Sequence, residues 1–176
     1  MSAPDFVEVL DFWFGAPNSP ERGRTRKVWF QKSEPFDAEV RSRFLITWER
    51  AARGQLEAWK TTPLASLALI VVLDQFPRNM FRGTPGAFSS DASALAAARG
   101  LIAMEFDRLL SPVERSFAYL PFEHAEDLAA WRSLEASAAA SGRDRLPDRS
   151  AFRCGRFFPP GFHIRDRKST RLNSSH

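Results

Sequence analysis

Two polar segments interrupt otherwise apolar helical patterns in this 176-residue chain, and they carry the residue types that could do chemistry. The first runs from Leu73 to Asn79 and continues through Pro85. Its candidate ligand-binding residues, a carboxylate, two amides and two guanidiniums, are Asp74, Gln75, Arg78, Asn79 and Arg82. Asp74 and Arg78 are four residues apart, so they can pair if a helix persists there. Because guanidinium groups recognise carboxylate and phosphate, this segment predicts a small anionic ligand.

The second segment, Pro121–Asp127, is acidic and contains a histidine. Glu123, His124 and Asp127 are the candidate catalytic residues. If the segment is helical, Glu123 and Asp127 share a face, with His124 and Glu126 on its flanks. Carboxylates beside an imidazole suit acid–base chemistry or a divalent ion. We assign no metal ligands, because the segment lacks the paired histidines of a His-Glu-x-x-His zinc helix, and the sequence identifies no cofactor.

Two functions and one purely structural explanation are compatible with these segments. The leading hypothesis is a binding or scaffold module, with a polar cleft between the segments that takes a protein or a small anionic ligand. The alternative is an enzyme whose carboxylate and histidine cluster does metal-assisted or acid–base chemistry on a small anionic substrate. The structural explanation is that the charges satisfy one another across a helix interface. It predicts a closed network of carboxylates with Arg78, Arg82 and Arg115, whereas a site requires side chains that converge on one accessible place.

The patterns around the two segments predict an all-α fold. Apolar residues recur at helical spacing over 5–14, 35–54, 64–73, 91–106 and 112–134. The stretch from Leu64 to Leu73 is apolar nearly all round, which predicts a central helix with neighbours on most sides. Phe and Trp number 16 and 5 and follow the same helical spacing, so we expect most of them to fill the core.

Capping residues and prolines predict where these helices begin and end. Thr62-Pro63 begins the central helix, Ser90 caps the next one, and Ser111–Glu114 has the form of a capping box. Pro77 should stop or bend the central helix near the preceding residue. Pro121 should interrupt the last helix.

The composition divides the chain into a helical domain and a tail. We expect a single domain over 1–135, an irregular and possibly frame-shifted segment over 136–165, and over 166–176 a stretch that resembles a translated sequencing adapter. Residues 1–130 carry 15 basic and 17 acidic residues, whereas residues 131–176 carry 10 and 4. The high isoelectric point therefore belongs to the tail and does not predict a nucleic-acid partner.

Cysteine usage and hydropathy predict the compartment. The single cysteine, Cys154, excludes an internal disulfide framework, and no secretory leader pattern precedes the first helix. The longest apolar run, Leu64–Leu73, is about half of the roughly 20 residues that a bilayer span needs. We therefore expect a cytoplasmic protein that does not enter a membrane.

Several motifs together make the chain resemble a known bacterial family. They are Val9–Gly15, Trp29–Lys32, Phe36–Asp37, Leu73–Asn79, Arg82–Pro85, Ala87–Phe88, Asp91 and Tyr119–Asp127. Over about residues 5–130 the chain is similar to domain-of-unknown-function family 924. The resemblance implies an all-helical domain of the tetratricopeptide-like superfamily and brings no established substrate or reaction. Family members continue with a Gly-Arg-Phe-Pro-His-Arg-Asn segment, of which this chain has only a partial counterpart at Gly155–Pro159.

Overall fold

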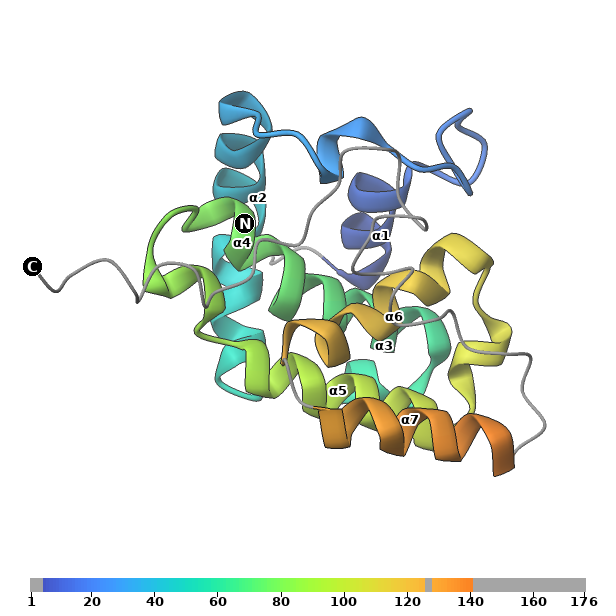
Figure 1. Ribbon diagram of the computed structural model, residues 1–176. Helices are drawn as coiled ribbons and strands as arrows, with labels where there is room; N and C mark the ends of the chain where they lie inside the picture. The colour runs from blue at the N-terminus through green and yellow to red at the C-terminus, as the bar shows by residue number, and fades with distance from the viewer. Residues whose placement is uncertain (1–4, 126–127, 141–176) are drawn as a thin grey trace, which may run out of the picture.

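The computed structural model describes residues 5–125 and 128–140, and every regular element within those ranges is helical (Figure 1). The longer helices are α1 (Phe6–Phe14), α2 (Glu34–Ala52), α3 (Pro63–Ile70), α4 (Phe76–Met80), α5 (Asp91–Ala103), α6 (Pro112–His124) and α7 (Leu128–Ala140). Five short turns of helix connect them: η1 (Lys27–Trp29), η2 (Glu57–Thr61), η3 (Val71–Gln75), η4 (Pro85–Phe88) and η5 (Phe106–Leu109). The predicted all-α fold is confirmed.

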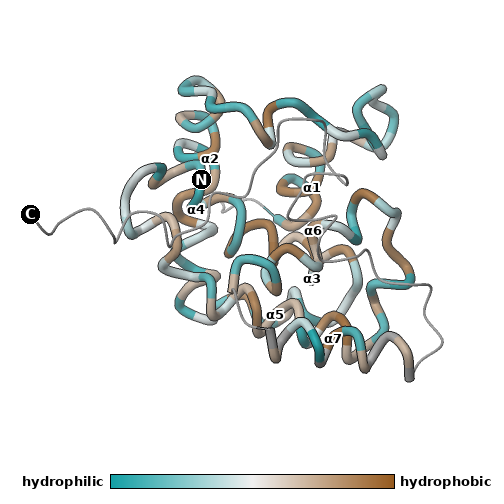
Figure 2. Tube along the Cα trace, viewed as in Figure 1, coloured by the Kyte–Doolittle hydropathy of each residue, from teal (hydrophilic) through white to brown (hydrophobic). Residues whose placement is uncertain are grey.

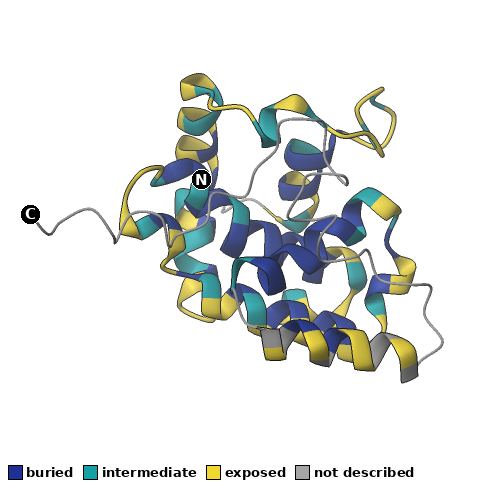
Figure 3. Ribbon diagram, viewed as in Figure 1, coloured by how far each residue is buried: buried dark blue, intermediate teal, exposed yellow. Residues whose placement is uncertain are grey.

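The predicted central helix is α3, which continues through η3 into α4. Every residue from Ala65 to Asp74 is buried, because α1, α5 and α6 contact α3 while α2 packs against η3 and α4. Figure 3 shows this column in dark blue, whereas α2 carries both buried and exposed residues. The hydropathy of α2 alternates in the same way in Figure 2, as expected for a helix with one face in the core.

Aromatic rings form a connected core between the first helices and α6. Phe44 lies 4.7 Å from Phe76, centroid to centroid, and Trp29 lies 4.8 Å from Phe117. Trp13 contacts Trp29, Phe76 and Phe117, so one buried indole joins three elements. Tilted and edge-on rings at these separations add to the free energy gained from burying their area. The aromatic residues thus have the core role that their spacing predicts.

The capping predictions hold wherever the cap is local. The Thr62 hydroxyl accepts from the Ala65 amide, and Ser111 and Glu114 form a reciprocal capping box. Ser90 occupies the predicted N-cap position of α5, but its side chain makes no capping bond. The prediction that its hydroxyl caps α5 is wrong, because that hydroxyl makes tertiary contacts instead.

The prediction for Pro121 is wrong, and of the two outcomes predicted for Pro77, a stop or a bend, the stop does not occur. Pro121 lies inside α6, which continues without interruption to His124. Pro77 does not stop the central helix either: η3 is a π-helical turn that leads directly into α4. In a regular α-helix the missing Pro77 amide would leave the Leu73 carbonyl without a donor. Here the turn is π-helical, and the Ser90 hydroxyl donates to that carbonyl at 2.6 Å.

The C-terminal part extends the helical region beyond the predicted boundary at residue 135. α7 continues to Ala140, and its Trp131 and Leu134 are buried as the apolar pattern predicts. Glu126, Asp127, Cys154 and the whole of 141–176 lie outside the described residues. No helix in the described part of the chain is both long enough and apolar enough to cross a membrane.

Candidate functional site

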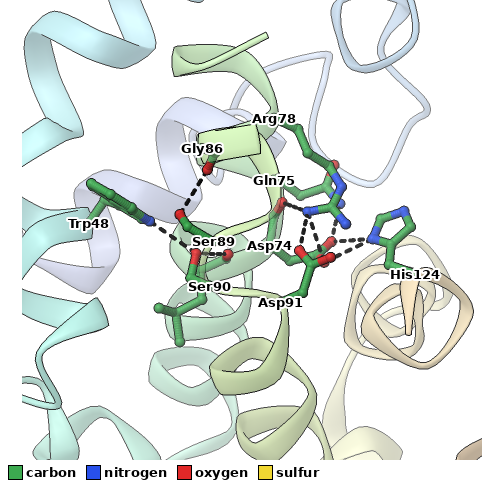
Figure 4. Close-up of polar contacts among 10 residues, drawn as sticks. Trp48, Asp74, Gln75, Arg78, Gly86, Ser89, Ser90, Asp91 and His124 are labelled. Atoms are coloured by element: carbon green, nitrogen blue, oxygen red, sulfur yellow. Dashed lines mark hydrogen bonds and ion pairs between the residues drawn. The ribbon is translucent and has the colours of Figure 1, made fainter. Parts of the chain in front are cut away.

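The π-helical turn η3 places Asp74 at the centre of a polar cluster. One extra residue in a turn rotates the side chains that follow by about 100°, because a regular helix turns that far per residue. Such turns occur often at functional sites. The Asp74 carboxylate is only 1% exposed, and it points toward the end of α6 (Figure 4).

Three side chains surround the Asp74 carboxylate. His124 Nδ1 lies 2.8 Å from Oδ1 and 3.0 Å from Oδ2. The Gln75 side-chain amide donates to Oδ2 at 2.6 Å. Arg78 Nη1 lies 3.5 Å from Oδ1, which is the pair predicted from their spacing of four residues. The structure therefore joins the two polar segments of the sequence at one carboxylate.

These neighbours determine the ionisation of Asp74 and the tautomer of His124. Burial alone would raise the pKa of Asp74. The charges of His124 and Arg78, with the hydrogen bonds from His124 and Gln75, outweigh burial and hold that pKa below its ordinary value of 3.8. An ionised carboxylate only accepts hydrogen bonds, so His124 must donate through Nδ1–H. In the neutral imidazole the lone pair is then on Nε2, which has no hydrogen bond to any described residue.

Arg78 lies on the same side of Asp74 as His124 and is also held by α5. Its Nη1 donates to the Asp74 carbonyl at 2.7 Å and to Asp91 Oδ1 at 2.9 Å. Its Cζ lies 5.4 Å from the centre of the half-exposed Phe88 ring. All its hydrogen bonds within the described ranges use Nη1, so Nε and Nη2 are available on a side chain that is 20% exposed.

The other two predicted ligand residues belong to a separate group around Asp37. Asn79 donates to Asp37 Oδ1 at 2.7 Å, and Arg82 donates to both Asp37 oxygens, at 2.7 and 2.9 Å. Burial would raise the pKa of Asp37, but hydrogen bonds from Arg82 and Asn79 and the charges of Arg82 and Lys32 hold it below 3.8. This group fastens α4 to α2.

The remaining candidates lie elsewhere. Glu123 is buried on α6 next to His124 in sequence, and Asp127 lies outside the described residues. Arg115 donates to the carbonyls of Asp107 and Leu110, so it takes no part in the polar cluster. Within the described ranges, no group of three or more His, Cys, Asp or Glu residues could hold a metal ion.

Two aspartates of these clusters were not among the candidate residues, although both stand within the motifs of the family resemblance. Asp91 begins α5 and reaches Arg78 across 13 residues, and Asp37 reaches Arg82 across 45. No spacing rule links residues so far apart. Apart from those motifs, the sequence signal for either is an acidic residue in the first turn of a helix.

A comparison with known protein families shows to which family the chain belongs. A family model described as "Bacterial protein of unknown function (DUF924)" matches residues 9–155. The chain belongs to the DUF924 family. The DUF924 match includes both polar groups and extends past residue 130, where the motif resemblance was expected to end.

A solved structure has a similar fold. The DUF924 chain is similar to a protein of unknown function, ATU0120, from Agrobacterium tumefaciens, with 29% sequence identity and a TM-score of 0.64. The similarity covers 84% of this chain and 95% of the Agrobacterium chain. No curated protein matches the DUF924 chain.

Proposed function

We propose that this DUF924 domain is a binding module for a small anionic molecule, held by Arg78 and His124 in front of the Asp74 carboxylate. One observation carries the proposal. Arg78 and His124 approach the same oxygen of Asp74, at 3.5 and 2.8 Å, while Nε and Nη2 of the arginine and Nε2 of the histidine have no described partner. The N–H donors of Arg78 suit a carboxylate or phosphate group, and Nε2 of His124 donates to that group when the ring is protonated.

The buried carboxylates set the direction from which an anion can approach. Asp74 and Asp91 would repel an anion, but Asp74 is 1% exposed and lies behind the two nitrogen-bearing side chains. An anion that reaches Nε or Nη2 of Arg78 meets N–H donors first. The tetratricopeptide-like superfamily, a resemblance at fold level only, is also compatible with a binding role.

Ligand-dependent stability tests this proposal, with inorganic phosphate and benzoate as probes. A ligand at ten times its dissociation constant stabilises the native state by about 1.4 kcal/mol. For a chain of this size that corresponds to a rise of about 3–6 °C in melting temperature. Arg78→Gln should abolish the rise, each variant being compared with its own ligand-free melting temperature.

Arg82→Gln is the matched control for charge on the same helix end. Its guanidinium already donates to both oxygens of Asp37, so we expect this variant to keep the response to phosphate and benzoate. Arg78→Lys gives a second test of the site if Arg78→Gln fails to fold, because lysine keeps a cation beside Asp91 but lacks the Nε and Nη2 donors. The proposal is wrong if neither probe raises the melting temperature, or if Arg82→Gln removes the effect as completely as Arg78→Gln.

A further inference from the structure

We infer that this site is catalytic: His124, oriented by Asp74, removes a proton from water at Nε2 during hydrolysis of a small ester that carries a carboxylate. The inference rests on the proposed function, because Arg78 must hold that carboxylate for the ester to lie beside the imidazole. His124 is then the catalytic residue and Asp74 a positioning residue.

The first argument is the orientation of the imidazole. Both oxygens of a fully buried carboxylate lie within 3.0 Å of His124 Nδ1, which fixes the ring and its tautomer. Nε2 is at the opposite edge of the ring from Nδ1, as Figure 4 shows, and the side chain is 12% exposed. The nitrogen that bears the lone pair is therefore turned away from the carboxylate, on a side chain that is partly exposed. A carboxylate that orients an imidazole in this way is the arrangement of general-base histidines in hydrolases.

The second argument is the charge around the ring when it takes up a proton. An imidazolium at His124 would contact the ionised Asp74 on η3, and Asp91 on α5 adds a second carboxylate through Arg78. Arg78 on α4 is the opposing cation, and Glu123 on α6 is a buried acidic neighbour in the chain. The ionised Asp74 therefore stabilises the imidazolium that forms when the base acts.

The third argument concerns the nucleophile. The serines drawn in this cluster are Ser89 and Ser90 (Figure 4). The Ser89 hydroxyl donates its proton to the Gly86 carbonyl at 2.8 Å, and the Ser90 hydroxyl donates to the Leu73 carbonyl at 2.6 Å. A hydroxyl has one proton, so neither serine can give it to His124 while these bonds exist. Water is accordingly the nucleophile that the base activates.

The proposed step is balanced with water as its only co-reactant. The water oxygen forms a bond to the acyl carbon while its proton moves to His124 Nε2. The bond between the acyl carbon and the leaving oxygen then breaks, and that oxygen takes the proton from Nε2–H. The products are a carboxylic acid and an alcohol, and the imidazole returns to its starting tautomer.

The experiment compares two esters that differ in one charge, 4-acetoxybenzoate and its neutral methyl ester, as substrates of the full chain. We expect a higher kcat/KM for the anionic ester and loss of that preference in Arg78→Gln. His124→Gln should lower kcat about a hundredfold or more, the usual contribution of a general base. Its amide can still donate to Asp74 but cannot take up a proton, so benzoate binding should persist.

Two further readouts separate a catalytic role from a structural one. The rate should rise with pH as one group loses its proton, and this dependence should be absent in His124→Gln. Asp74→Asn can donate to Nδ1 and thereby leave the ring proton on Nε2, so it should lower kcat much more than it changes KM.

Each other outcome contradicts a stated part of the reasoning. If benzoate binds but the anionic ester is hydrolysed no faster than in His124→Gln, the catalytic inference is wrong and the binding proposal stands. If neither benzoate nor phosphate binds and no ester is hydrolysed, both are wrong. Equal rates for the charged and neutral esters would refute the role given to Arg78.

Discussion

Replacing the buried carboxylate at the centre of the cluster, Asp74→Asn, should destabilise the fold by about 3–5 kcal/mol at pH 7, because it breaks a buried charged network by removing one member. We expect the lower end of that range. Arg78 keeps Asp91 at 2.9 Å, and both it and His124 are partly solvated. The side-chain amide of the new asparagine would also point N–H donors at Gln75 or His124. Both of those side chains already donate to this position, so donor would face donor.

The lowered pKa of Asp74 determines how its contribution to stability changes with pH. The pKa of Asp74 in the folded chain lies below its ordinary value of 3.8. Its stabilising contribution is therefore fully present above about pH 5 and is lost as the pH falls through the folded pKa. Asp74→Asn has no such titration. The difference in stability between the parent and this variant should shrink as the pH falls below 4.

Urea unfolding followed by tryptophan fluorescence at several pH values measures this difference. Asp37→Asn is the matched control, because that aspartate also pairs with an arginine. Arg82 is 40% exposed, so water screens its pair with Asp37, and we expect a cost of about 1 kcal/mol. The reasoning fails if Asp74→Asn costs no more than Asp37→Asn at pH 7, or if its cost is unchanged at pH 3.

Two other substitutions test contacts that position the site, and the same urea assay at pH 7 measures both. Ser90→Ala should lower the free energy of unfolding by about 2–4 kcal/mol, because the Leu73 carbonyl and Trp48 Nε1 would lose the partner they have at 2.6 and 3.0 Å. An unchanged urea midpoint would show that the carbonyl does not need this donor. Gly15→Ala should cost about 1–3 kcal/mol, since φ is +90° and the added Cβ would lie 2.5 Å from another side chain. Gly23→Ala, at φ +76° with nothing within 4 Å, should cost less and isolates the backbone effect.

Local signals in the sequence predicted local structure well. Thr62 and Ser111 cap helices as expected, since a cap depends on the next three residues alone. The prolines were harder, because the cost of a missing amide depends on what else can reach the carbonyl. The Ser90 hydroxyl reaches the Leu73 carbonyl from 17 residues away, and no pattern of nearby residues contains that information.

The same limit applies to the site. The pairing of Asp74 with Arg78 could be predicted, because four residues in a helix bring side chains together. The sequence predicts one group of Arg82, Asp74 and Arg78, but the structure separates Arg82 from the other two. α4 ends at Met80, so helical spacing no longer relates the two arginines. Its partner Asp37 is 45 residues distant, on a helix whose packing against α4 depends on the whole core. Contact between Asp74 and His124 required the same knowledge of packing.

The two arginines also show where a purely structural explanation of the polar residues is sufficient. Arg82 directs Nε and Nη2 to the two oxygens of one carboxylate, so both oxygens of Asp37 have a donor and the two charges are paired. Arg78 is held by Nη1 alone, although it has two carboxylates nearby, and its outer donors face the same region as the open nitrogen of His124. The Asp37 group therefore needs no ligand to account for its geometry, whereas the Asp74 group has donor capacity that a bound anion would use.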